Sequence, residues 1–271
     1  VIRRHFYAGR GFGPAGHAAF VFNDGRYKSL ALGGDQLSSW AFVMDGPKWV
    51  TSESLKPEDP DFLIGTKVMR ASPTDWDHAR RKKVVPSAWY TPLPYEKTFH
   101  VVGFADGVRP TDALFVLGGW DSIGSPGEAN SIRMFRHDGH QFLFRADGND
   151  QRKPRPGRFY QNSIVVESGN YSVAPPCAAE LLVHHDGPAV GMVASRLNDF
   201  HGVDWTRHIS WRRGRYYAVI DVCRVKQPGP LTIVNQWWNR DVPGLKGNRW
   251  IAHTDRGTFH LLMADPGAVS N

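Results

Sequence analysis

The amino-acid sequence predicts an all-β fold, a large antiparallel β-sandwich of the supersandwich type with one or two short helices. Twenty-eight Gly and 19 Pro in 271 residues indicate many turns. An aromatic content of 12% favours strands, because aromatic side chains fit a pleated surface. Short apolar runs alternate with Asp-Gly pairs, which is the pattern of β-hairpins, since Gly adopts positive φ without steric cost.

Twelve short runs rich in Val, Phe and Ile are the predicted strands. They cover residues 18–22, 100–104, 113–117, 131–135, 141–145, 162–167, 180–184, 190–195, 208–211, 216–225, 231–236 and 258–263. The turns between them include Asn23-Asp24-Gly25, Asp138-Gly139, Asp147-Gly148, Ser168-Gly169, Asp186-Gly187 and Arg213-Gly214. Closely spaced strands joined by such tight turns pair in antiparallel fashion.

Helical signals are confined to two segments. Residues 74–83 begin with Thr, carry two Asp in the first turn and end in Arg and Lys, a charge order that suits the helix dipole. Residues 35–42 predict a further short turn of helix. The acidic segment 51–61 and the Pro-rich segment 86–94 are predicted to be loops.

The composition is that of an ordinary globular chain, with 41% hydrophobic and 22% charged residues, which excludes a disordered or collagen-like protein. No apolar run approaches the roughly 20 residues of a membrane-spanning helix, so no membrane partner is expected. Two cysteines, Cys177 and Cys223, do not make a disulfide framework. The chain opens on Val1 without a signal-peptide pattern and is interpreted as a mature or excised segment.

An excess of basic residues gives a net charge of +7 and an isoelectric point near 9.5, which favours an anionic partner. The basic residues concentrate in three runs, at residues 80–83, 152–158 and 212–215. Nucleic acid would use the same charge, but no helix-turn-helix, zinc-finger or RNP motif accompanies these runs, so no nucleic acid is expected. Each run taken alone would be solvated loop charge; together with the resemblance below, the three favour an acidic glycan.

Several segments between residues 118 and 238 carry a pattern in a fixed order. The strongest is DWTRHISWRRGRYYAVID at residues 204–221, a strand with Trp and Arg that leads through a basic Gly turn into an aromatic-aliphatic strand ending in Asp. Weaker segments are residues 127–132 with 138–143, residues 160–166, Pro175-Pro176 and residues 235–238. In this order they resemble the β-sandwich portion of the heparinase II/III-like polysaccharide lyases.

The resemblance implies a lyase that cleaves a uronate-containing acidic polysaccharide by β-elimination, in the periplasm or outside the cell. The chain is accordingly divided into residues 1–110, a first β-sheet region with loops and a short helix, and residues 111–271, the heparinase II/III-like β-sandwich region. In that family an α/α-toroid precedes the sandwich and supplies a catalytic Tyr. This sequence contains no helical array, so a helical toroid domain or chain upstream is the expected partner.

The sequence departs from the family where some members bind a metal. The family carries His at the position of Gln161, and a His-rich, Asp-containing approach where this chain has Ser125-Pro126-Gly127-Glu128. These replacements argue against a divalent metal, and no cofactor is expected.

β-Elimination requires a base for the C5 proton and a group that neutralises the neighbouring carboxylate. The candidate catalytic residues are His17, in a Gly-rich loop, and His137 and His140, which flank the Asp138-Gly139 turn. On one continuous strand the latter two would face opposite sides, but across the turn they could meet one ligand together. The alternative is that all three are surface histidines without a ligand.

The candidate substrate-binding residues lie in the segments that carry the resemblance: Arg207, Trp205, Tyr160, Gln161, Asn162 and Trp237. Arg207, with the two amides, would bind the uronate carboxylate, Arg by a two-point contact. The Trp residues would stack on sugar rings, although at most one of Trp237 and Trp238 can face a given cleft. The alternatives are that Arg207 bonds to a neighbouring loop to lock the sandwich, and that most Trp side chains are core.

Two functions therefore stay open. The first is the β-sandwich portion of a polysaccharide lyase, with catalysis shared with a helical domain. The second is a non-catalytic, carbohydrate-binding or scaffolding sandwich in which the metal and catalytic positions have been lost, which the Gln161 and Glu128 replacements favour.

Overall fold

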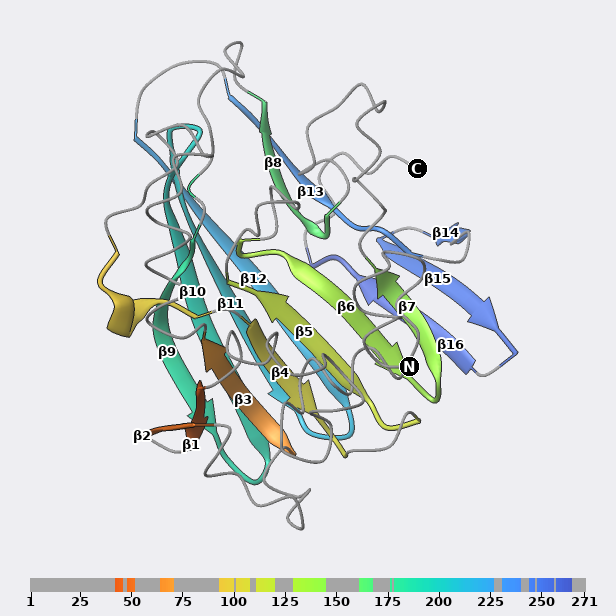
Figure 1. Cartoon of the computed structure of the whole chain (residues 1–271). Helices are drawn as coiled ribbons and strands as arrows, with labels where there is room; N and C mark the ends of the chain where they lie inside the picture. The colour runs from red at the N-terminus through yellow and green to blue at the C-terminus, as the bar shows by residue number, and fades with distance from the viewer. Residues whose placement is uncertain are drawn as a thin grey trace, which may run out of the picture.

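The computed structural model describes residues 42–45, 48–51, 64–70, 93–99, 101–107, 111–119, 129–144, 161–167, 176, 178–226, 231–239, 244–246, 248–255 and 257–264. Within these residues the fold is built from antiparallel β-sheets, which confirms the predicted all-β class (Figure 1). The only helical element among them is the 3-10 turn η5 (Tyr95–Lys97). The predicted helix at residues 74–83 lies outside the described residues, and Phe42, placed in a helical turn by the sequence, begins strand β1.

Seven strands form the larger sheet, in the order β2-β1-β3-β4-β5-β6-β7. Each neighbouring pair is antiparallel. The strands are β1 (Phe42–Asp45), β2 (Lys48–Thr51), β3 (Gly65–Arg70), β4 (Val101–Ala105), β5 (Leu114–Gly118), β6 (Ile132–His137) and β7 (His140–Phe144). Since β4 pairs with β5, the division expected at residue 110 falls inside this sheet.

Four strands form the second sheet, in the order β12-β11-β10-β9, and they follow one another along the chain as antiparallel hairpins. They are β9 (Glu180–Asp186), β10 (Val190–Phe200), β11 (Val203–Arg212) and β12 (Tyr216–Val225). Gly202 and Gly214 sit in the last two turns with φ of 82° and 64°, so the glycines occupy backbone positions that other residues adopt only with strain.

Two smaller groups of strands complete the described fold. β8 (Ser163–Glu167) pairs with β13 (Thr232–Gln236), and β14 (Gly244–Lys246), β15 (Arg249–Thr254) and β16 (Gly257–Leu262) form a three-stranded sheet. Asn162, just before β8, makes an isolated bridge to Ile132 of β6. The β8–β13 pair is thereby attached to the larger sheet.

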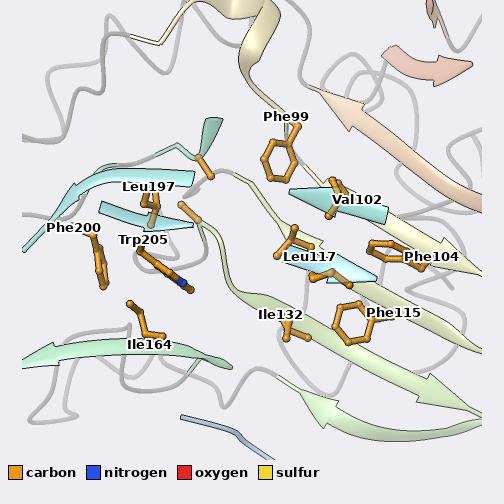
Figure 2. Close-up of a cluster of buried hydrophobic side chains, with 14 of the residues drawn as sticks. Phe99, Val102, Phe104, Phe115, Leu117, Ile132, Ile164, Leu197, Phe200 and Trp205 are labelled. Carbon is orange, nitrogen blue, oxygen red and sulfur yellow. The ribbon is translucent and has the colours of Figure 1, made fainter. Parts of the chain in front are cut away.

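The two large sheets enclose the core between them. Alternate residues of β11 are buried while the residues between them are partly exposed, as expected for a strand with one face on a core. Phe104 of β4 lies edge-on to Trp211 of β11 and to Tyr217 of β12, each at 6.2 Å between ring centroids. Phe115 of β5 stacks on Tyr217 at 4.8 Å. Figure 2 shows how the buried side chains from distant segments fill the same space.

A carboxylate at one end of the sandwich ties the two sheets together. Asp186, at the end of β9, accepts hydrogen bonds from the Thr66 backbone N–H and from Lys67 Nζ of β3, both at 2.9 Å. Arg213, in the turn after β11, pairs with the same carboxylate. The β9–β10 and β11–β12 turns are therefore fixed against the start of β3.

None of the described residues forms a helix with the length and apolar character needed to cross a lipid bilayer.

Candidate functional site

Five of the site residues predicted from the sequence lie where β8, β11 and β13 meet. Trp205 and Arg207 are alternate residues of β11 and both point into the core. Gln161 and Asn162 immediately precede β8, and Trp237 immediately follows β13, the strand paired with β8. Of the other four predicted residues, Tyr160 and His17 lie outside the described residues.

Arg207 and Asp221 are cross-strand partners on β11 and β12 and form a two-point ion pair. Arg207 Nε lies 2.7 Å from Asp221 Oδ1, and Nη2 lies 2.9 Å from Oδ2. Nη1 donates to the carbonyl oxygens of Asn130 and Asn162, each at 3.0 Å. Trp205 Nε1 also donates to Asp221 Oδ1, at 2.8 Å, and its ring centroid lies 4.7 Å from the guanidinium carbon.

The amides beside this pair also contact protein groups. Asn162 Nδ2 donates to the Ile132 carbonyl oxygen at 3.0 Å, and Asn162 Oδ1 accepts the backbone N–H of Trp238. Gln236 Nε2 donates to the Gln161 carbonyl oxygen at 3.0 Å. These bonds attach the start of β8 to β6 and to the segment after β13.

The contacts match the alternative in which Arg207 locks the sandwich. Its side chain is 0% exposed, and Trp205, Gln161 and Asn162 are buried as well, while Trp237 is half-buried against the core. A glycan carboxylate could reach the guanidinium only by displacing Asp221 or by opening the sheet. The sequence therefore identified a real cluster, but the described structure gives four of its members no surface for a ligand.

Three members of the cluster were not identified from the sequence: Asp221, Asn130 and Ser195. Asp221 interrupts the apolar run of β12, and a buried acid requires a partner. Its pairing with a buried Arg could therefore have been predicted from the sequence. Asn130 has φ of 62°, donates from Nδ2 to the Trp205 carbonyl oxygen at 3.4 Å and accepts the Ser195 hydroxyl on Oδ1. Nothing in the sequence indicated the contacts among Asn130, Trp205 and Ser195, because these residues come from three separate segments.

His137 and His140 lie elsewhere, at the tip of the β6–β7 hairpin. They are direct cross-strand partners, and the turn residues Asp138 and Gly139 have φ of 49° and 74°. Directly opposed residues project from the same face of a hairpin, so the expectation that the two imidazoles flank the tip together is confirmed. His137 is exposed, and His140 lies against the Phe142 ring at 4.7 Å.

The same end of the sandwich carries the basic β11–β12 turn. Partial burial raises the pKa of the Asp106 carboxyl, just after β4, whereas a hydrogen bond from the Gly214 backbone and the charges of His137 and Arg213 act in the opposite direction. Asp106 therefore lies close to both turns. Figure 1 shows the β6–β7 and β11–β12 connections at the lower edge of the view. We call this region, formed by Asp106 and the turns at residues 137–140 and 213–215, the hairpin end.

The cations near the hairpin end differ in their contacts. Arg213 and Lys67 both pair with Asp186, so both side chains are held by contacts within the protein. Arg212 and Arg215 are exposed and make no ion pair within the part of the chain that the structure describes. Arg215 lies in the turn itself.

Tyr217, close to the hairpin end, is packed between the sheets. Burial, and to a smaller extent the charge of Asp106, raises the pKa of its hydroxyl well above the ordinary value. Its ring stacks on Trp211 at 5.7 Å between centroids. A hydroxyl that holds its proton so firmly does not act as a base near neutral pH.

The described residues contain no group of three or more His, Cys, Asp or Glu side chains arranged to hold a metal ion. Gln161 lies where the sequence resemblance implies a His, and its side chain offers an amide instead of an imidazole or carboxylate. The donor set around it, of amides and backbone carbonyls, does not fit a transition-metal site.

The fold and these two regions define an antiparallel β-sandwich protein. Two solved structures are similar to it: heparan sulfate lyase HepC from Pedobacter heparinus and a mutant of that lyase. The similarity has TM-scores of 0.44 and 0.47 at 14% and 11% sequence identity, and it covers 57% and 73% of this chain. It spans 26% and 30% of the two lyase chains. No protein-family model and no curated protein sequence matches the chain.

Proposed function

We propose that this chain is the β-sandwich portion of a polysaccharide lyase, and that it contacts a uronate-containing acidic glycan through the hairpin end. The observation that carries the proposal is the convergence of two segments about 75 residues apart in sequence. Asp106 accepts a hydrogen bond from the Gly214 backbone of one turn and interacts electrostatically with His137 of the other. The sequence pattern of residues 204–221, which resembles the heparinase II/III-like lyases, includes the turn that contains Gly214.

The hairpin end offers the two kinds of group that β-elimination uses. Arg215 can neutralise the uronate carboxylate, which makes the C5 proton more acidic. An imidazole of His137 or His140 can accept that proton, since a neutral imidazole is an effective base near pH 7. The C5–H bond then breaks, its electrons form the C4–C5 double bond, and the glycosidic oxygen leaves from C4. Tyr217 takes no part, because its hydroxyl stays protonated.

The acid that protonates the leaving oxygen is assigned to a helical companion domain. The Tyr217 side chain is packed between the sheets, and Arg207 is buried in its ion pair with Asp221. A shared cleft between the sandwich and a helical domain would supply the missing acid and the remaining carboxylate contacts. We propose a periplasmic or secreted location, because acidic polysaccharides of this kind occur outside the cytoplasm.

The second candidate is a non-catalytic glycan-binding sandwich, and one observation favours it. Two of the predicted carboxylate-binding residues, Arg207 and Asn162, make structural hydrogen bonds through their side chains in the interior, and the Gln161 side chain is buried. A sandwich that retains only exposed cations such as Arg215 would bind an acidic glycan without cleaving it.

The test combines binding and cleavage on the full chain, with alginate, heparin and hyaluronan as probes. Ultraviolet absorbance of the unsaturated product follows cleavage, and calorimetry at low ionic strength follows binding. The variants are His137→Ala, His140→Ala and Arg215→Ala, with Arg249→Ala, an exposed arginine of β15, as the matched control. Arg215→Ala should weaken binding about fivefold and Arg249→Ala should not, since one exposed ion pair contributes at most about 1 kcal/mol.

The outcomes separate the candidates. Product formation that His137→Ala or His140→Ala abolishes, with binding retained, supports the lyase. Binding that depends on Arg215 without product, also after addition of a helical domain from the same protein, supports the non-catalytic sandwich. Absence of binding to all three glycans, or equal effects of Arg215→Ala and Arg249→Ala, overturns the proposal.

A further inference from the structure

The outer face of the four-stranded sheet is apolar in its centre. The side chains of β11 that do not enter the core, from Asp204 to Arg212, define this face, and the cross-strand register identifies their neighbours on β10 and β12. Its large apolar side chains are exposed: Ile220 60%, Val222 50%, Val183 45% and Met192 37%. Aliphatic side chains gathered on one exposed face indicate an interaction surface.

These side chains lie in a band of three adjacent rows, whose central row also contains the imidazole of His208 and the buried Ala194. One row of cross-strand partners runs from Ile220 of β12 through His208 of β11 and Ala194 of β10 to Val183 of β9. Met192 lies one row to one side of it, and Val222 one row to the other. The band therefore crosses all four strands at the middle of the face.

On β11 and β12 the charges of this face lie at its two ends, whereas β10 and β9 carry the Arg196–Glu180 ion pair one row from the centre. At one end Arg212 stands opposite Tyr216, and at the other Asp204 stands opposite Arg224. His208 lies midway between Arg212 and Asp204 along β11. Asp204 accepts the Asp199 N–H at 2.8 Å and keeps a carboxylate that is 28% exposed, with Lys226 Nζ at 3.6 Å.

We propose that this face packs against the same face of a second copy of the chain, about a twofold axis that passes through the row of Ile220 and His208. This rotation lays each strand antiparallel over its own copy. Ile220 then meets the partner's Ile220, and Arg212 meets the partner's Asp204. Tyr216 meets the partner's Arg224, a cation–π pair.

Charge complementarity selects this occupant. The order of outer side chains along β11 is acid, hydroxyl, imidazole, hydroxyl, base, at Asp204, Thr206, His208, Ser210 and Arg212. The twofold axis reverses this order in the partner, so that acid meets base, hydroxyl meets hydroxyl and imidazole meets imidazole. An isologous twofold contact requires a surface that is complementary to itself in this way.

The size of the face is sufficient for a stable contact. Four strands about 4.8 Å apart and about nine residues long, at about 3.4 Å per residue, give a face of about 600 Å². Two copies would then bury about 1,200 Å² together, which is within the lower range of specific protein interfaces. The hairpin ends would lie at opposite poles of the dimer, so this inference does not depend on the proposed glycan contact.

The experiment is sedimentation velocity of the full chain over a range of concentrations, with circular dichroism to verify folding of each variant. Ile220→Glu places two carboxylates at the axis and should raise the dimer Kd by more than about 100-fold. Leu262→Glu, on β16 and 57% exposed, is the matched control and should leave the Kd within about threefold. Arg212→Glu should raise the Kd about tenfold, as should Asp204→Lys, and the double variant should restore it to within about threefold.

The outcomes decide whether the outer face of the four-stranded sheet is a dimer interface. A concentration-dependent dimer that Ile220→Glu dissociates and the double charge reversal restores supports the interface. A wild-type chain that stays monomeric at about 100 µM overturns it. A dimer that tolerates Ile220→Glu, or that Leu262→Glu dissociates equally well, uses another surface and overturns it too.

Discussion

Arg207 on β11 and Asp221 on β12 form a two-point ion pair, with Nε–Oδ1 at 2.7 Å and Nη2–Oδ2 at 2.9 Å, inside the sandwich. Because the remaining nitrogen donates to the carbonyls of Asn130 and Asn162, one side chain connects four segments. A buried ion pair adds little net stability compared with apolar residues of the same volume. Loss of one partner is different, because it leaves a buried charge without compensation.

We therefore predict that Arg207→Ala lowers the free energy of unfolding by about 3–5 kcal/mol. Arg207→Lys keeps the charge but cannot form the planar two-point contact, and should cost about 2 kcal/mol. Urea unfolding followed by tryptophan fluorescence measures both. Arg215→Ala, at an exposed position in the turn after the same strand, is the control and should stay within about 0.5 kcal/mol of the wild type. Equal stability of the Arg207 and Arg215 variants would mean that the ion pair does not form in solution.

The Tyr217 hydroxyl predicts an unusual response to substitution. It is buried and has no hydrogen-bond partner among the described residues, while its ring packs on Phe115 and Trp211. Tyr217→Phe keeps the ring and removes an unsatisfied polar group, so stability should be unchanged or rise by about 1 kcal/mol. Tyr217→Ala removes the ring and should cost about 3 kcal/mol. A thermal scan of both variants checks this, and a loss of stability in Tyr217→Phe would indicate that the hydroxyl has a partner.

Asp186 predicts how stability depends on pH. Burial raises the pKa of its carboxyl, but the hydrogen bonds from Lys67 and the Thr66 N–H, with the charges of Lys67 and Arg213, outweigh burial and leave the pKa below the ordinary value. A group whose pKa is lower in the folded state stabilises the fold above its unfolded pKa of about 3.9, and this contribution is lost as the pH falls further.

At pH 6 the wild-type chain should therefore have a higher urea midpoint of unfolding than Asp186→Asn. The difference between the two midpoints should shrink below about pH 4. Asp138→Asn is the charge-matched control, since Asn tolerates the positive φ of this turn position. A difference between wild type and Asp186→Asn that stays constant down to pH 2.5 would show that the carboxylate charge is not what stabilises this end.

The strands were predictable where the sequence alone carries the signal. Residues 216–225 were predicted and found as β12, because the run is continuous and follows a clear Gly turn. β10 and β11 are longer than predicted, at Val190–Phe200 and Val203–Arg212. In the additional residues, core-facing side chains alternate with polar side chains on the outer face. A strand predicted from an apolar run alone therefore ends before the real strand does.

The cluster around Arg207 was predictable in some of its members but not in its arrangement. The sequence indicated Arg207 and Trp205, yet their burial depends on the register that sets Arg207 opposite Asp221. That register, and the approach of the Asn130 and Asn162 carbonyls, exists only after folding. The two histidines could be placed correctly because one local turn, with Asp138 and Gly139 at positive φ, determines their relation.

Cys223 gives a prediction that probes the same interior by chemistry. The residue lies on β12 opposite Trp205, and burial together with the charge of Asp221 raises the pKa of its thiol to about 11, against a smaller lowering by Arg207. At pH 8 only about one thiol in a thousand would then be ionised, compared with about a quarter in the unfolded chain.

We predict that a thiol-disulfide reagent labels native Cys223 at least about 100-fold more slowly than it labels the urea-unfolded chain, because the thiolate is the reactive form. The measurement uses a Cys177→Ser background, so that one thiol reports. Between pH 8 and 10 the native rate should rise about tenfold per pH unit, whereas the unfolded rate should level off above its lower pKa of about 8.5. A native rate that levels off at the same pH as the unfolded rate would place Cys223 in a solvated environment, and the Arg207–Asp221 interior beside it would have to be open as well.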